Sequence, residues 1–334
     1  MAALDTGNPT ILDMVKRTDP DGSIANVVEA LSQRNPILLD AAVQEGNGVD
    51  FHRVTIRSGL PAVGYRKYNE GVTKGKSTTT QVDEAMSMLE GRSVVDVALA
   101  KRNGNEQAFR ASEDLAFLQA MNNKQADSLF YASVAVDPEK FHGLTPRFDD
   151  ETGGANSDNV IAVDTGAAGD DASSIWFITW HPDTVFLTYP KGSTVGISQM
   201  DLGIEYEEDA SGATPASKFL AYRTHFKWDM GLVVKDWRYV VRLGDIDESI
   251  NIAAINQTII QAMINGYNHI YDLNVGRNVI YMSRTVKTWL ELQINDKSNL
   301  HLGMTEWHGM QVLAFRGIPI VTCDALKKTE TNLA

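Results

Sequence analysis

Several residue types and motifs that carry chemistry are missing from this sequence of 334 residues. A single cysteine, Cys323, excludes an internal disulfide and any zinc site built from several cysteines. The sequence contains no glycine-rich phosphate-binding motif, no HExxH metal motif and no GxSxG nucleophile motif. It therefore lacks the common sequence signatures of an enzyme, and we expect no catalytic residue, no cofactor and no metal.

Long apolar runs are also missing. No window approaches about 18 consecutive apolar residues, the length that suggests a membrane-spanning helix. The first 22 residues contain no basic segment followed by an apolar one, so we expect no secretory signal. These features, together with the single cysteine, fit assembly in a reducing cytoplasm.

The residues that most resemble ligands or nucleophiles have simpler explanations. His301 and His308 lie seven positions apart without a third ligand, which favours surface or interface histidines over a metal site. Cys323 follows the apolar stretch IPIVT and is expected to be a small buried side chain. The aromatic residues between 176 and 239 alternate on predicted strands, so we expect most of them in the core rather than on a base-stacking surface.

What is present is an ordinary folded composition with an acidic balance. Hydrophobic residues make up 43% and charged residues 22%, enough for a substantial core in about two domains. The formal net charge is −13. Such a chain is a poor general binder of nucleic acid, because phosphate affinity comes mainly from clustered Lys and Arg.

The charges are unevenly distributed along the chain. Residues 51–81 contain six basic side chains and one acidic one, whereas residues 201–209 contain five acidic side chains and no basic one. Residues 137–171 contain nine acidic and two basic side chains. These segments are either solvated loops or complementary patches that meet between copies of the chain. The candidate contact residues are Arg57, Arg66, Lys67, Lys74, Lys76, Asp149, Asp150, Glu151, Glu205, Glu207, Glu208 and Asp209.

The basic segment also has a distinctive structural pattern. Residues 51–58 alternate like a strand, residues 78–89 resume an extended pattern, and glycines punctuate the polar stretch between them. A two-stranded ribbon of this kind is marginal alone in water, so it needs a neighbour on which to lie.

The rest of the chain predicts a mixed α+β architecture. Apolar periodicity predicts a long helix over residues 109–132 and an amphipathic helix over 249–270. Further elements are expected as short helices over 8–15 and 23–33, a short helix or its lead-in over 92–104, two strands over 174–193, a long strand pair over 218–243 bent at Trp228–Gly231, a strand over 278–283, a helix over 284–294 capped by Ser283, and two strands over 310–326 around Arg316–Gly317.

Three segments resemble a known family: FRASEDLAFLQAMNNKQADSLFYAS, DPEKFHGLTPRF and WDMGLVVKDWRYVVRLGDID. They are similar to the major capsid proteins of short-tailed double-stranded DNA bacteriophages, which share the Hong Kong ninety-seven type coat fold. The resemblance extends from about residue 10 to residue 330, and the segments occur in the same order.

The resemblance implies four parts of the subunit. These are an N-terminal arm (1–49), an E-loop β-hairpin (50–92), a P domain (93–245) with a spine helix (109–132), and an A domain (246–334). The long strands at 218–243 precede the helix at 249–270, which resembles the permuted variant of the fold.

The resemblance also implies a structural role, without enzymatic activity. The chain would assemble with itself into the hexamers and pentamers of an icosahedral head enclosing a double-stranded DNA genome, which it contacts only non-specifically. It would act in the virion after assembly in the bacterial cytoplasm, without a membrane. A separate scaffolding protein, a portal and a decoration protein would be its partners. A nanocompartment shell of the same fold and an α+β enzyme with an unrecognised site are the alternatives.

Overall fold

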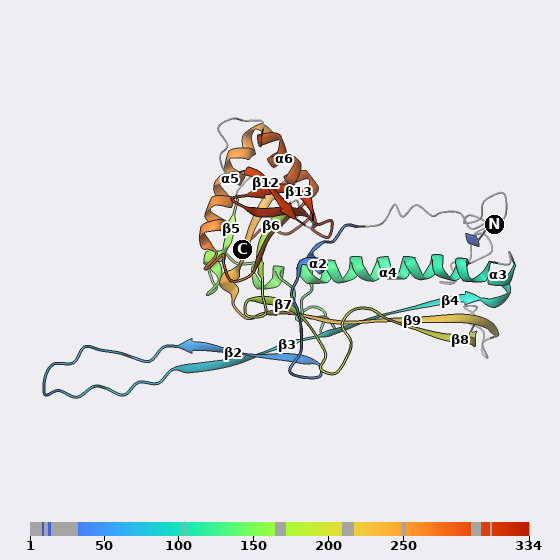
Figure 1. Ribbon diagram of the computed structural model, residues 1–334, viewed down its shortest axis with the longest axis horizontal. Helices are drawn as coiled ribbons and strands as arrows, with labels where there is room; N and C mark the ends of the chain where they lie inside the picture. The colour runs from blue at the N-terminus through green and yellow to red at the C-terminus, as the bar shows by residue number, and fades with distance from the viewer. Residues whose placement is uncertain are drawn as a thin grey trace. The chain divides into compact units, whose positions relative to one another are not determined.

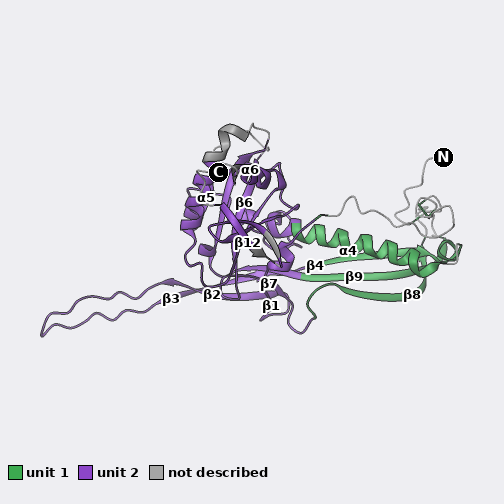
Figure 2. Ribbon diagram, turned by 45° about the horizontal axis from the view of Figure 1, so that its top comes forward, with its two compact units in different colours: residues 1–33, 88–126, 194–229 green, residues 34–87, 127–193, 230–334 purple. Residues whose placement is uncertain are grey.

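The computed structural model describes residues 9, 13–14, 33–102, 105–163, 172–208, 217–248, 252–294, 302–307 and 309–333. The chain divides into two compact units, which are coloured separately in Figure 2. Unit 1 comprises Met1–Gln33, Met88–Ala126 and Thr194–Asp229, and unit 2 comprises Arg34–Ser87, Asp127–Ser193 and Met230–Ala334.

Unit 1 is a layer of strands with a helix over one face (Figure 2). The strands are β4, β8 and the first part of β9, and α4 is the helix; β8 pairs with β9 in antiparallel register. The elements of this unit are β4 (Ser87–Asp96), α3 (Val97–Lys101), α4 (Glu106–Tyr131), β8 (Ser198–Glu208) and β9 (Lys218–Val234), of which Ser87 and the ends of α4 and β9 belong to unit 2.

Aromatic side chains hold α4 on these strands. Phe117 of α4 stacks on Phe226 of β9 with ring centroids 5.8 Å apart. Gly91 of β4 makes room for this contact, because a Cβ atom at that position would lie 3.2 Å from the Phe117 ring. At the start of the helix, Phe109 is buried in a cluster with Val95. The helix is thus positioned by its apolar face, as its periodicity predicts.

The larger sheet of unit 2 is built around β6, whose residues are all buried. Strands β10 and β11 both pair with β6 in antiparallel register. The described strands follow the order β12-β13-β14-β11-β6-β7-β9, with β1 beside β7 and β5 beside β10. Their bounds are β1 (Val43–Glu45), β5 (Val160–Ala162), β6 (Ala172–Trp180), β7 (Val185–Tyr189), β10 (Val240–Asp247), β11 (Arg277–Met282), β12 (Leu302–Trp307), β13 (Met310–Phe315) and β14 (Ile318–Thr322).

Two helices contribute to the main apolar core of unit 2. Helix α5 (Ile252–His269) buries Ile259 and Met263, and α6 (Arg284–Ile294) buries Val286. The N–H of Val286 donates to the hydroxyl of Ser283 at 3.3 Å, so the expected helix cap is confirmed. The remaining helical elements are α2 (Ile37–Asp40), η1 (Thr145–Arg147), η2 (Ser157–Asn159) and η3 (Trp237–Tyr239).

The expected hairpin is present and extends away from the rest of unit 2 (Figures 1 and 2). Strands β2 (Phe51–Gly59) and β3 (Thr78–Ala85) pair in antiparallel register, with Val54 opposite Val82. Residues 60–77, here called the tip, form neither helix nor strand. All residues from 60 to 83 are exposed.

Several local expectations agree with the structure. The helices expected over 109–132, 249–270 and 284–294 correspond to α4, α5 and α6, and the strand expected over 278–283 corresponds to β11. Cys323 is buried, with 1% of its surface exposed, and Trp176 and Phe177 are in the core. The helices expected over 8–15 and 23–33 lie almost entirely outside the described residues, and His301 and His308 do so as well.

The expected strand pair over residues 218–243 is wrong in two respects. Strand β9 runs unbroken through Trp228–Gly231, where a bend was expected. It does not pair with β10, because the chain changes direction at η3 and β10 pairs with β5 and β6 instead. Gly231 serves close packing, since a Cβ atom there would lie 2.9 Å from the carbonyl oxygen of Ala85.

This close approach makes Gly231 a sensitive position. The Cβ atom in Gly231→Ala would also lie 3.0 Å from Met86 Cγ, so we expect about 1–3 kcal/mol of destabilisation from overpacking. Urea unfolding of unassembled subunits measures the change. The matched control is Gly303→Ala in β12, where nothing lies within 4 Å of the added atom. Equal stability of both variants would contradict the role assigned to Gly231.

Candidate assembly surfaces

The hairpin is held at its base by a largely buried ion pair. The guanidinium of Arg147, in η1, donates to both carboxylate oxygens of Glu84, in β3, at 2.7 and 2.6 Å. It also donates to the carbonyl oxygens of Gly143 and His142. The side chains of Glu84 and Arg147 are only 8% and 16% exposed. A two-pronged contact of this kind fixes the direction of the carboxylate as well as its distance.

Two histidines lie next to this pair. His52 stands opposite Glu84 across the hairpin, and its ring meets Phe186 edge to face at a centroid distance of 5.3 Å. Burial lowers the pKa of His52, assisted by the charge of Lys235 and opposed by Glu84. Burial also lowers the pKa of His142, and the charge of Arg147 adds to the shift. Both shifts favour neutral rings around the ion pair.

Beyond its base, the hairpin presents apolar and basic groups to solvent. Val63 is 91% exposed, and Tyr65 and Tyr68 are also almost completely exposed. The candidate residues Arg57, Arg66, Lys67, Lys74 and Lys76 are all exposed and make no ion pair within the described part of the chain. In contrast, Arg53, nearer the base, pairs with Asp83 at 2.6 Å. Clustered exposed apolar groups of this kind mark interaction surfaces.

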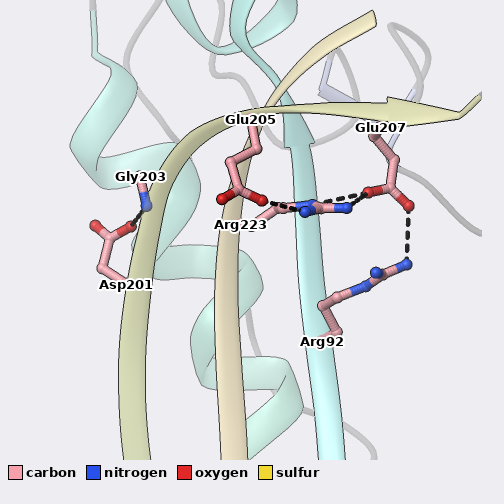
Figure 3. A network of polar contacts seen from close by, with 6 residues as sticks. All are labelled: Arg92, Asp201, Gly203, Glu205, Glu207 and Arg223. Carbon is pink, nitrogen blue, oxygen red and sulfur yellow. Dashed lines mark hydrogen bonds and ion pairs between the residues drawn. The ribbon is translucent and has the colours of Figure 1, made fainter. Parts of the chain in front are cut away.

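The acidic candidates of β8 are already engaged within unit 1 (Figure 3). The guanidinium of Arg223 lies between the carboxylates of Glu205 and Glu207 and hydrogen-bonds to both. Arg92 donates to the other oxygen of Glu207 at 2.8 Å. The hydrogen bonds that Arg223 makes to Glu207 and, with a smaller effect, to Glu205 raise its pKa. The network therefore neutralises much of the acidic charge that the sequence places here.

Other β8 acids behave in a similar way. Asp201 pairs with Arg110 at 2.7 Å and accepts a bond from the N–H of Gly203 at 2.8 Å, and both contacts lower its pKa. Glu208 is exposed and lies 3.6 Å from Lys218. Asp209, the last of these candidates, is outside the described residues.

The second acidic candidate segment, residues 149–151, has a different environment in unit 2. The carboxylate of Asp150 accepts from the N–H groups of Thr152 and Gly153 at 2.7 and 2.9 Å, and these bonds lower its pKa. Asp149 and Glu151 are exposed, and neither forms an ion pair with another described residue. This short segment retains charge that another molecule can reach.

Sequence reasoning therefore located the charges but not their partners. It identified the basic tip as one exposed group, and it missed β8 as a strand. The alternation of Met200, Leu202, Ile204 and Tyr206 with polar residues was the available signal for β8. Nothing local signalled the Glu84–Arg147 pair, whose members are 63 positions apart.

The described residues contain no group of His, Cys, Asp and Glu side chains arranged to hold a metal ion. None of the described helices has the length and apolar character of a membrane span. Burial raises the pKa of the Cys323 thiol to about 12, which keeps it protonated and unreactive at neutral pH.

An α+β chain that carries a long exposed hairpin with an anchored base has the form of a subunit built for assembly. Comparison with known proteins identifies the assembly. The chain belongs to the major capsid protein GP7 family, whose model matches residues 19–334. No curated protein matches it.

Solved structures of phages and related particles resemble the chain. A chain in the near-atomic-resolution structure of bacteriophage Epsilon15 is 32% identical, with coverage of 100% of this chain and 99% of that one and a TM-score of 0.79. The bacteriophage JBD30 capsid gives 10% identity, coverage of 89% and 93%, and a TM-score of 0.46. For the capsid of a native GTA particle, the identity is 11%, the coverage is 68% of this chain and 95% of that one, and the TM-score is 0.44.

The protein is therefore a structural subunit of a phage capsid, which assembles with copies of itself into the shell of the virion. The expected α+β coat fold and structural role are confirmed. The permuted order, the domain boundaries and the contact residues stay predictions.

The ion pair at the hairpin base gives a stability prediction. Arg147→Met leaves Glu84 buried without its partner, so we expect a loss of about 3 kcal/mol in the free energy of unfolding. Combining it with Glu84→Leu removes the stranded charge and should recover most of that loss. Chemical unfolding of unassembled subunits measures both.

A matched control for Arg147→Met is available on the same hairpin. Arg53→Met breaks the Arg53–Asp83 pair, whose side chains are 46% and 47% exposed, and should cost clearly less stability than Arg147→Met. If the two single variants lost equal stability, the Glu84–Arg147 pair would not be the anchor of the hairpin.

Proposed function

We propose that the hairpin tip of each subunit docks on an acidic surface of an adjacent copy, within hexamers and pentamers that enclose a double-stranded DNA genome. The observation that carries this proposal is the exposure of Tyr65, Tyr68 and the basic residues around them. Such a ribbon gains little from its own chain, so a neighbouring subunit supplies the surface against which it is buried.

Residues 149–151 are the better acceptor for the basic tip. Glu207 is only 13% exposed and is bound by two arginines, so a third cation would gain little there. Asp149 and Glu151 are exposed and without an ion-pair partner among the described residues. Complementary charges at such a contact guide the correct approach and oppose wrong ones.

The docking contact has to be weak individually. A contact of about 4 kcal/mol corresponds to a dissociation constant near 1 mM, so a misplaced subunit can leave. Many such contacts made together hold the closed shell. A net charge of −13 also suits a DNA container, because a wall dense in Lys and Arg would bind the genome tightly.

We assign the parts of the chain to roles in the shell as the family resemblance suggests. Residues 1–49 act as the arm, 50–92 as the E-loop, 93–245 as the P domain and 246–334 as the A domain, in the permuted order. The compact units do not follow these spans, since Asp127–Ser193, from the P-domain span, clusters with Met230–Ala334 in unit 2. The spans describe how the shell uses the chain, and the units describe its internal packing.

The remaining partners follow from the same role. A separate scaffolding protein directs assembly in the cytoplasm of the bacterial host, a portal occupies one vertex, and a decoration protein adds to the finished shell. DNA is contacted only non-specifically. The subunit itself carries out no catalysis and needs no cofactor.

Charge reversal at the tip tests the docking contact. We expect Arg66→Glu together with Lys67→Glu to lower the yield of shells several-fold, because two attractions become repulsions. The subunit should remain folded, since both side chains are exposed. Sedimentation and electron microscopy measure the shells, and circular dichroism checks the subunit. A normal yield of shells from this variant would contradict the docking proposal.

A second reversal identifies the acceptor. Adding Asp149→Lys and Glu151→Lys to the tip variant should restore shells, because the charges again match. Adding Glu205→Lys and Glu207→Lys should not, and it should destabilise the subunit, because Arg223 and Arg92 lose their partners. Rescue by the β8 reversals alone would assign the acceptor to β8 instead.

A further inference from the structure

Residues 323–333, here called the C-terminal clasp, follow β14 and contact several separate elements of unit 2. They form no helix and, apart from an isolated bridge between Ala172 and Glu330, no strand. Their partners include the segment before α2, the last residue of α4, strands β6 and β10, and the first residue of α6. One short segment therefore joins parts of the unit that are far apart in the sequence.

The first half of the clasp holds the segment before α2. The N–H of Arg34 donates to the carboxylate of Asp324 at 2.8 Å, and the N–H of Asp324 donates to the carbonyl oxygen of Arg34 at 3.1 Å. The guanidinium of Arg284 binds both oxygens of the same carboxylate at 2.6 and 2.5 Å. Asp324 therefore links the backbone of Arg34 to the side chain of Arg284.

Asn35 extends this contact into the interior. Its side-chain oxygen accepts from the N–H of Ala325 at 3.1 Å and lies 3.6 Å from the sulfur of Cys323. Asn35 is 6% exposed and Cys323 is 1% exposed. The two residues through which the N-terminal arm joins unit 2 are therefore fixed by side chains and backbone of the clasp.

The second half of the clasp is locked by a buried charge. Glu330 accepts from Arg242 at 2.8 Å, from the hydroxyl of Ser174 and from the hydroxyl of Tyr131. The side chains of Arg242 and Glu330 are each 3% exposed. Arg242 donates also to the carbonyl oxygen of Phe148 at 2.7 Å. A buried pair that is hydrogen-bonded on all sides selects one position for the segment that carries it.

We propose that the C-terminal clasp makes the subunit competent to assemble, by fixing at Arg34 and Asn35 the origin of the N-terminal arm. The inference rests on the proposed function, in which residues 1–49 act as the arm. The part proposed to reach neighbouring subunits is the part before Arg34, because α2 and β1 belong to unit 2. An arm with a fixed origin reaches a neighbour at lower entropic cost than one whose first residues are free.

The order of synthesis gives the clasp a second consequence. Residues 323–333 come after every other described element of unit 2, and Arg34 is joined to a residue 290 positions later. Arg34 and Asn35 therefore lack these partners until the clasp has been made and has closed, although α2 just after them is held through Asp40 by Arg277 and Tyr281. A contact of such sequence separation also forms late, because a long loop has to close first. Arm-mediated assembly is thereby delayed until the subunit is complete.

Substitution of Asp324 in the full-length chain tests the proposal. Asp324→Ala removes the acceptor of Arg34 and Arg284, whereas Asp324→Asn keeps a neutral acceptor and preserves part of the contact. We expect Asp324→Ala to speed amide hydrogen exchange in residues 33–41 by about tenfold, with no change in the core strand β11. Shell yield should fall several-fold, with Asp324→Asn intermediate.

The control removes a carboxylate elsewhere on the same part of unit 2. Glu291→Ala, on α6, breaks a pair with Lys287 at 3.5 Å and should behave like the unaltered chain in both measurements. Normal shell yield from Asp324→Ala would overturn the proposal. Equal acceleration of exchange in β11 would also overturn it, because the effect would then be general loss of stability.

A chain lacking residues 1–32 separates this inference from the proposed function. Normal shells from that chain would reject the arm as an assembly element, whatever the exchange at residues 33–41 shows. Loss of shells in that chain, together with normal shells from Asp324→Ala, would leave the arm in place and reject the clasp.

Discussion

A two-stranded ribbon has no interior, and this constraint governs how the hairpin of this capsid subunit is built. Its base is buried at only a few points. The Glu84 carboxylate is paired with Arg147, and Val54 packs in a small cluster with Phe186. Outward from these contacts, every residue from 60 to 83 is exposed. The base therefore fixes where the ribbon begins, while the stability of its outer part depends on contacts made after assembly.

The same constraint explains the different treatment of charge in the two regions. On β8, Glu205 and Glu207 share Arg223, so these two carboxylates already have a partner within the subunit. At the tip, Arg66 and Lys67 have no ion-pair partner among the described residues. Charge that is satisfied internally contributes to the subunit, whereas charge that is left exposed is available to a neighbour. The sign of a segment alone does not distinguish these roles.

Elements with a strong local pattern could be predicted from the sequence, and elements set by distant partners could not. Helices α4, α5 and α6 have apolar residues at helical spacing, and the hairpin has alternation broken by glycines. Gly231 looks like a bend in the sequence but packs against the backbone of Ala85, 146 positions earlier. The Glu84–Arg147 pair was unpredictable for the same reason, because a salt bridge between distant residues leaves no periodic trace. The charged residues of the candidate surfaces were found, but their pairing was not.

The long-range contacts divide into those that the chain completes alone and those that it leaves open. Glu330 is enclosed by Arg242, Ser174 and Tyr131, so every charge in that contact is satisfied within unit 2. The tip has the opposite arrangement, with aromatic and basic side chains directed to solvent. A subunit that assembles in many copies needs both. Contacts completed within the subunit, such as that of Glu330, give every copy the same geometry. The exposed tip gives each copy a contact that becomes favourable only when a neighbouring subunit binds.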